Sequence, residues 1–153
     1  KRRILLKGSL AAGAVGVAVG AGLLTPRAVL AAWPEGAFKA ESVDDALSAL
    51  LGSNTHEASD SIKIKAPDIA ENGAVVPVTV ESDAEGISSI SIIAAGNQTP
   101  LIASFELGAG AVGFVSTRIK MAKTAEVVAV VKAGDKIMSS AKEVKVTIGG
   151  CGG

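Results

Sequence analysis

The sequence Val144-Lys145-Val146-Thr147-Ile148 runs directly into Gly149-Gly150-Cys151-Gly152-Gly153. In the first half, β-branched apolar residues alternate with polar ones, which is the period of a strand with one buried face. In the second half, the four glycines lack a Cβ and resist being fixed in one conformation. The stretch therefore predicts that a rigid final strand ends at Ile148 and that residues 149–153 form a flexible arm.

More strand-like segments precede this one, separated by glycine, proline, asparagine and aspartate. Together the expected strands are residues 62–65, 75–81, 87–95, 101–107, 112–121, 125–132 and 136–148. Pro77 suggests a sheet edge or a bulge within the second of them. About seven short strands at regular spacing favour an all-β fold, an immunoglobulin-like antiparallel β-sandwich. The Cys…Trp…Cys pattern of antibody domains is absent, so the expectation concerns the architecture alone.

One N-terminal helix is expected ahead of the strands, at residues 41–52, after a short lead from Trp33. Ser42 is a suitable N-cap, Asp44 and Asp45 occupy the first turn, and Gly52 provides the C-terminal stop. Apolar residues recur at helical spacing at Val43, Ala46, Leu47, Leu50 and Leu51. The pattern predicts a helix that packs on the domain or on a partner.

Residues 1–32 have the organisation of an export signal. Lys1-Arg2-Arg3-Ile4-Leu5-Leu6-Lys7 is basic, residues 8–26 are uncharged, and small residues at 28–32 resemble a signal-peptidase site. The pair Arg2 and Arg3 resembles the twin-arginine signal, which implies export of the folded protein to a bacterial periplasm. The alternative is an uncleaved anchor, because the uncharged stretch is just long enough to span a bilayer. Cleavage is favoured, which leaves no membrane attachment.

The expected domain organisation is a signal at 1–32, the helix and sandwich at 33–148, and the arm at 149–153. Five of the 15 basic residues and none of the 15 acidic residues lie in residues 1–32, so the remainder carries a formal charge of −5. This acidic balance makes a nucleic-acid partner a poor fit. His56, the single histidine, is interpreted as a surface residue, since a zinc site needs several converging ligands. No metal site and no other cofactor are expected.

Cys151 is the one cysteine of the chain, and nothing beside it in the sequence activates it. A cysteine thiol has a pKa of about 8.5, which nearby cations or a helix N-terminus lower. Neither adjoins Cys151, and Lys145 is the nearest cation along the chain. The residues thus predict a carrier without catalytic groups of its own. The alternatives are a structural or adhesive domain linked by an intermolecular disulfide, and a thiol oxidoreductase, which the absence of a Cys-x-x-Cys pair disfavours.

Taken with the signal and the strand series, the Gly-Gly-Cys-Gly-Gly ending resembles the SoxY family, the sulfur-carrier subunits of the bacterial Sox thiosulfate-oxidation system. The resemblance implies that Cys151 is the covalent attachment site for sulfur intermediates, with Gly149, Gly150, Gly152 and Gly153 as the flexible arm. It also implies a heterodimer with a SoxZ-like subunit and Sox enzymes that load, hydrolyse and oxidise the bound sulfur. The helix or an exposed strand edge is the expected partner surface, and a disulfide homodimer through Cys151 is a further alternative.

Overall fold

A computed structural model describes residues 33–150 of the 153-residue chain. The expected export signal, with Arg2 and Arg3, lies outside the described residues, as do Cys151, Gly152 and Gly153. Within residues 33–150, no helix has the length and apolar character that a membrane span requires.

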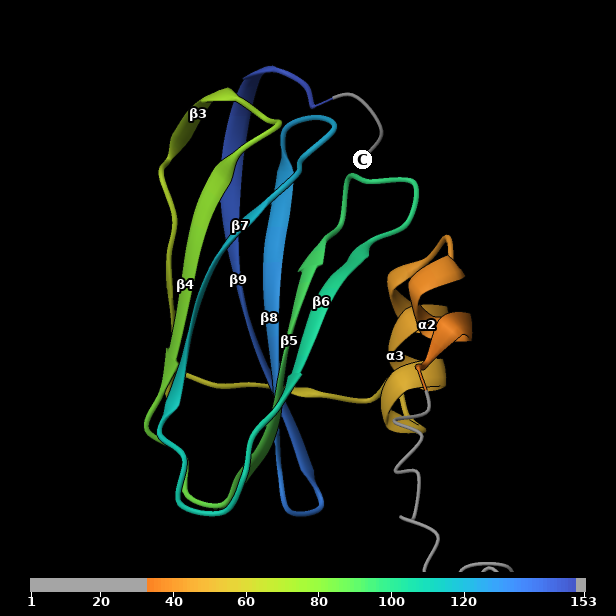
Figure 1. The fold of residues 1–153 in the computed structure, drawn as a ribbon, viewed down its shortest axis with the longest axis vertical. Helices are drawn as coiled ribbons and strands as arrows, with labels where there is room; N and C mark the ends of the chain where they lie inside the picture. The colour runs from red at the N-terminus through yellow and green to blue at the C-terminus, as the bar shows by residue number, and fades with distance from the viewer. Residues whose placement is uncertain (1–32, 151–153) are drawn as a thin grey trace, which may run out of the picture. The chain divides into compact units, whose positions relative to one another are not determined.

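Two β-sheets pack face to face in the domain that residues 33–150 form (Figure 1). The larger sheet has the strand order β1-β9-β8-β5-β6, with β3 also paired to β9, and the smaller has the order β2-β4-β7. The strands are β1 (Glu57–Ala58), β2 (Ile62–Lys65), β3 (Ile69–Asn72), β4 (Val76–Ser82), β5 (Ile87–Ala94), β6 (Leu101–Glu106), β7 (Gly113–Ile119), β8 (Ala125–Ala133) and β9 (Lys136–Ile148). The expected β-sandwich is confirmed, and each of the seven expected strands is present.

The two strands that the sequence did not reveal, β1 and β3, are also the exceptions to antiparallel pairing. Both pair in parallel with β9, β1 through Glu57 and Met138, and β3 through Ile69 and Lys145. Their residues do not alternate between buried and exposed over a useful length, so backbone pairing rather than side-chain burial defines them. Hydrophobic periodicity cannot detect such strands.

Turn residues act where the sequence placed them. Gly134, at φ 59°, and Asp135 form the two-residue connection between β8 and β9, in which Ala133 faces Lys136; a glycine at the first position suits this tight hairpin. Pro77 lies in the part of β4 that β2 does not reach, because the β2–β4 pairing ends at Lys65 and Thr79. There β4 has β7 alone as its sheet neighbour, so the proline occupies a local edge.

The main core lies between the sheets. Alternate residues of β5 and β8 point inward and meet the inner faces of β4 and β7, and the largest are fully buried: Ile90, Ile92, Val127, Val131, Val76, Val78, Val80, Ile119 and Met121. The opposite face of β5 and β8 is also apolar and forms a second cluster that includes Ile93, Leu101 and Val130. The large sheet is thus buried on both faces at its centre, which explains the continuous apolar run of β8.

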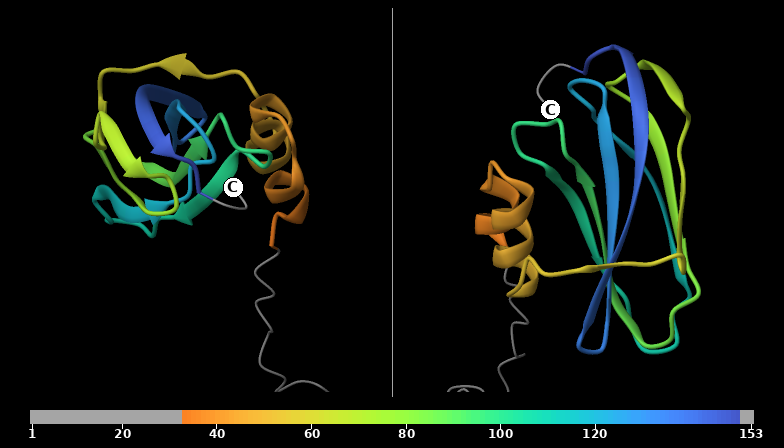
Figure 2. Two further views of the ribbon diagram at one scale, coloured as in Figure 1. Left: turned by 90° about the horizontal axis from the view of Figure 1, so that it is seen from above. Right: turned by 180° about the vertical axis from the view of Figure 1, so that it is seen from behind.

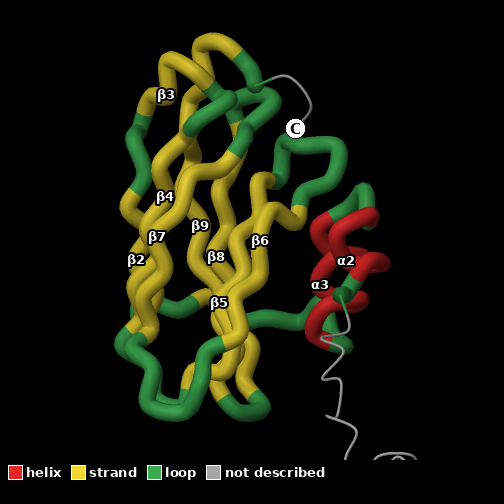
Figure 3. Tube along the Cα trace, in the orientation of Figure 1, coloured by secondary structure: helices red, strands yellow, loops and turns green. Residues whose placement is uncertain are grey.

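Two helices, α2 (Glu35–Lys39) and α3 (Val43–Leu51), cover this second face, next to β6 (Figures 2 and 3). The expected helix is confirmed as α3, with Gly52 left-handed at φ 77° and Ala46 and Leu47 buried. Of the two expected packing surfaces, the domain itself is the one that α3 uses. The lead from Trp33 contains α2, a second helix. Its five residues are too short to show a period; Ala37 is buried against the sheet, and Lys39 pairs with Glu35 at 2.5 Å.

The N-cap of α3 offers a test of local stability. The Ser42 hydroxyl oxygen accepts a hydrogen bond from the Asp45 N–H at 3.1 Å, so Ser42→Ala leaves one of the first backbone donors of the helix without its partner. We expect a loss of about 1 kcal/mol in the free energy of unfolding, measured by urea denaturation. Ser48→Ala, at an exposed position inside the same helix, is the control and should be neutral or slightly stabilising. Equal losses in both variants would contradict a capping role.

Candidate functional site

The segment that leads to Cys151 is the last part of β9. Val144, Val146 and Ile148 share one face, but along it burial falls from complete at Val144 to partial at Val146, and Ile148 is 66% exposed. In this part β9 is paired with β3, from Ile69 and Lys145 to Asn72 and Ile148. The strand therefore leaves the core while its backbone is still held by a neighbour.

Beyond Ile148 the chain remains attached to the domain by backbone hydrogen bonds. The N–H of Gly73 donates to the carbonyl of Ile148 at 2.7 Å, the N–H of Met121 donates to the carbonyl of Gly73 at 2.7 Å, and the N–H of Gly150 donates to the carbonyl of Met121 at 2.9 Å. We call this group of bonds the tail anchor. The β3–β4 turn, the β7–β8 loop and the end of β9 that carry it lie at the same end of the sandwich (Figure 1).

The tail anchor brings backbone segments closer than side chains permit. A Cβ on Gly150 would lie 2.8 Å from the Gly73 carbonyl oxygen and 2.9 Å from the Ala74 Cα, and one on Gly149 would collide with the Ala122 carbonyl oxygen. Glycine is the residue that allows such an approach. Gly149 and Gly150 were expected to belong to a flexible arm, but the described structure packs both against the domain and buries Gly150. For residues 151–153 the arm stays a prediction.

Asn97 holds the β7–β8 loop in place. Its side chain is 7% exposed, its amide donates to the Lys120 carbonyl at 2.8 Å, and its carbonyl oxygen accepts from the Ala122 N–H at 2.8 Å. These bonds lie on either side of Met121, the residue that accepts the bond from Gly150. The sequence marked Asn97 as a turn residue, but its contact with the distant loop had no signal there.

Removing this side chain should weaken the domain. Asn97→Ala leaves the Lys120 carbonyl and the Ala122 N–H without their partners, so we expect a loss of about 2 kcal/mol in the free energy of unfolding. Urea denaturation followed by circular dichroism measures it, and Gln98→Ala, at the exposed neighbouring position, is the control. A cost of less than about 0.5 kcal/mol for Asn97→Ala would show that water replaces both bonds.

Lysine side chains surround the anchor in sequence. Lys120 and Lys123 flank Met121 in the β7–β8 loop, and Lys145 lies on β9; all are exposed. Within residues 33–150, the three ion pairs involve other lysines, namely Lys39, Lys65 and Lys142. The sequence drew attention to Lys145 as the nearest cation along the chain. The fold adds Lys120 and Lys123, because the Gly150–Met121 bond joins their loop to the base of the tail.

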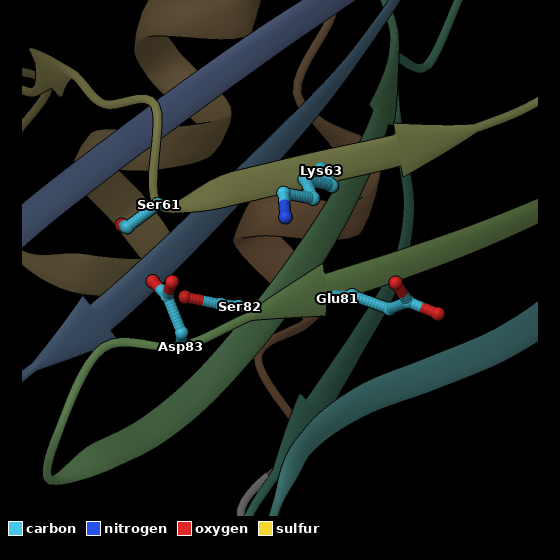
Figure 4. A pocket seen from close by; sticks show the side chains of 5 residues that line it. All are labelled: Ser61, Lys63, Glu81, Ser82 and Asp83. Atoms are coloured by element: carbon cyan, nitrogen blue, oxygen red, sulfur yellow. The ribbon is translucent and has the colours of Figure 1, made fainter.

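Other candidate sites in the described residues are not supported. His56 is exposed, with its Nδ1 2.7 Å from the Ser139 Oγ, which fits the expected surface role. No group of metal-ligating side chains occurs in residues 33–150. A pocket of about 190 Å³ on the small sheet is lined by Ser61, Lys63, Glu81, Ser82 and Asp83. In it the carboxylates of Glu81 and Asp83 point in different directions (Figure 4), and Glu81 is already paired with Lys65 at 2.6 Å.

The fold and the tail define an all-β carrier domain with one cysteine beyond its last strand, and comparison with known proteins gives the family. Residues 47–151 match the family described as sulfur oxidation protein SoxY. The chain belongs to the SoxY family of sulfur carrier proteins.

Solved structures agree with this assignment. The sulfur carrier protein SoxY from Chlorobium limicola f thiosulfatophilum is 48% identical, with a TM-score of 0.64, covering 70% of this chain and 97% of that one. A superoxide reductase (neelaredoxin) from Ignicoccus hospitalis is 18% identical, with a TM-score of 0.50, covering 60% of this chain and 80% of that one, and shows a similarity of fold alone. The comparison with curated protein sequences gave no match.

Proposed function

We propose that this protein carries the intermediates of thiosulfate oxidation covalently on Cys151 and presents them to partner enzymes in the periplasm. The observation that carries the proposal is the family match, which extends to residue 151 and so includes the cysteine. The twin-arginine pattern with Arg2 and Arg3 supports export. The work of catalysis belongs to the partners, since the chain supplies a sulfur atom beside glycines that carry no acid, base or metal ligand.

The proposed cycle balances at one sulfur atom. An electron-accepting partner joins thiosulfate to the Cys151 thiol, which loses a proton while an electron pair passes to the acceptor and an S–S bond forms. Hydrolysis then breaks the bond to the sulfonate, releases sulfate and leaves a persulfide on the cysteine. A second electron-accepting partner oxidises the outer sulfur to a sulfonate with oxygen from water. A last hydrolysis releases sulfate and returns the thiol.

A SoxZ-like subunit is the proposed constant partner. The helix α3 was one candidate for its contact surface, but the apolar face of α3 packs on the large sheet of its own domain. Strands β6 and β7 each have a single sheet neighbour and expose backbone donors and acceptors along one edge, which suits pairing with another chain. We therefore place the partner at a strand edge.

The mass of the carrier purified from cells supplied with thiosulfate tests the proposal. Intact protein and the peptide that contains Cys151 are measured with and without reductant. We expect reductant-sensitive additions of sulfur or of a thiosulfonate group on Cys151. A free thiol under every condition, or a plain homodimer disulfide, would replace the carrier interpretation with that of a disulfide-linked structural domain.

A further inference from the structure

The point at which the chain leaves the domain determines which surface a partner enzyme meets. In the tail anchor, bonds of 2.7 to 2.9 Å join Ile148, Gly73, Met121 and Gly150 in series. We propose that Gly73 and Met121 are positioning residues, which fix the base of the tail so that Cys151 is presented between the β3–β4 turn and the β7–β8 loop. This inference rests on the proposed function, because it assumes that Cys151 is the working atom.

Burial supports a fixed anchor. Gly73 and Gly150 are buried, and Met121 is 0% exposed. Buried backbone groups are paired in native proteins because an unpaired one costs more than a typical hydrogen bond contributes. Releasing Gly150 would break its bond to Met121 and expose both groups to water. The anchored arrangement is thus the one that the packing favours.

The glycines lead to the same conclusion through shape. A Cβ on Gly73 would collide with the Met121 carbonyl oxygen and would lie 2.8 Å from the Val146 Cγ1 and 2.9 Å from the Gly150 nitrogen. Those atoms belong to β9, to the β7–β8 loop and to the tail, so Gly73 is the position where all of these segments converge. Asn97 supports the arrangement from the other side of the loop.

The anchor shortens the reach of the tail. Cys151 follows Gly150 by one peptide bond, and consecutive Cα atoms are about 3.8 Å apart. A free glycine-rich arm that starts at Gly149 would have a reach of about 12 Å. A partner enzyme must therefore approach the domain itself, next to Val75, which is 54% exposed, and Ile148, which is 66% exposed. These apolar side chains lie two residues along the chain from Gly73 and Gly150.

Amide hydrogen exchange of the unmodified protein is the first test. Within a folded anchor, the Gly150 N–H should exchange at least about tenfold more slowly than in an unstructured chain, because one hydrogen bond of ordinary net strength changes an opening equilibrium by that factor. Exchange of this amide at the unstructured rate would overturn the proposal. The measurement needs no variant and does not depend on sulfur chemistry.

Gly73→Ala is the second test, with Gly108→Ala as its matched control, since a Cβ at Gly108 meets nothing within 4 Å. In Gly73→Ala we expect faster exchange at Gly150 and greater mobility of a nitroxide label on the single cysteine. In extracts of thiosulfate-oxidising cells, we expect a several-fold higher half-saturating concentration of the unlabelled variant for loading, with the maximal rate unchanged. The control should match the unmodified protein in every measurement.

The outcomes separate the two proposals. Loading of Cys151 together with an unprotected Gly150 amide would leave the carrier function intact and remove the anchor. A protected amide without sulfur adducts on Cys151 would keep the anchor and remove the carrier function. Faster or equal loading of Gly73→Ala at low concentration would show that the anchored position is not what the partner recognises.

Discussion

Cys151→Ser should abolish sulfur transfer completely and leave the free energy of unfolding unchanged. A serine hydroxyl cannot form the S–S bond on which the proposed cycle depends, and the chain has no second cysteine to replace it. Residue 151 follows the last strand, and the two apolar clusters of residues 33–150 are formed by side chains that precede it in the chain. Adduct mass and loading by cell extracts measure the first effect, and urea denaturation measures the second.

The control for this variant is the unmodified protein with Cys151 blocked by iodoacetamide. It should also fail to load, which separates loss of the thiol from any effect of serine. Residual sulfur adducts on Cys151→Ser would place the attachment site elsewhere in the chain. A stability loss of several kcal/mol would show instead that the thiol is part of the folded domain.

The largest loss of stability is expected for Ile92→Ala, about 3 to 4 kcal/mol in the free energy of unfolding. Ile92 is 0% exposed at the middle of β5, where it faces Ala103 of β6 and Ala129 of β8. Its neighbours are too small and too fixed by the sheet to fill the space that the substitution leaves. Urea denaturation gives the difference in midpoint at constant slope.

Ile69→Ala is the matched control, because the same residue type is 62% exposed there, on β3. We expect a cost below about 1 kcal/mol. If the two substitutions had equal effects, burial between the sheets would not be the main source of stability in this domain.

The sequence predicted those elements whose side chains alternate or recur on one face. The seven longer strands follow the two-residue period, and α3 is delimited by Ser42 and Gly52. Strands β1 and β3 escaped because their pairing with β9 involves backbone groups, which leave no pattern in the side chains. The helix α2 escaped because five residues span little more than one turn.

At the site, the sequence identified the cysteine and the glycines around it but interpreted all the glycines in one way. Lack of a Cβ has two consequences, freedom of the chain and close approach of backbones, and the sequence of the tail does not distinguish them. For Gly149 and Gly150 the fold selects close approach, through Gly73 and Ala122. Those partners come from distant segments, so their proximity is a property of the tertiary structure.

The parallel pairing of β3 with β9 makes the base of the tail depend on the whole domain. Gly73, Met121 and Gly150 are far apart in sequence, so the entropy of closing the intervening loops must be overcome before their bonds can form. In a chain that has not finished folding, Cys151 would be an ordinary exposed thiol, open to exchange with any disulfide it meets. Completion of the fold thus acts as quality control for the carrier, and substitutions in the distant core can change its chemistry by lowering the fraction of chains that hold the thiol in place.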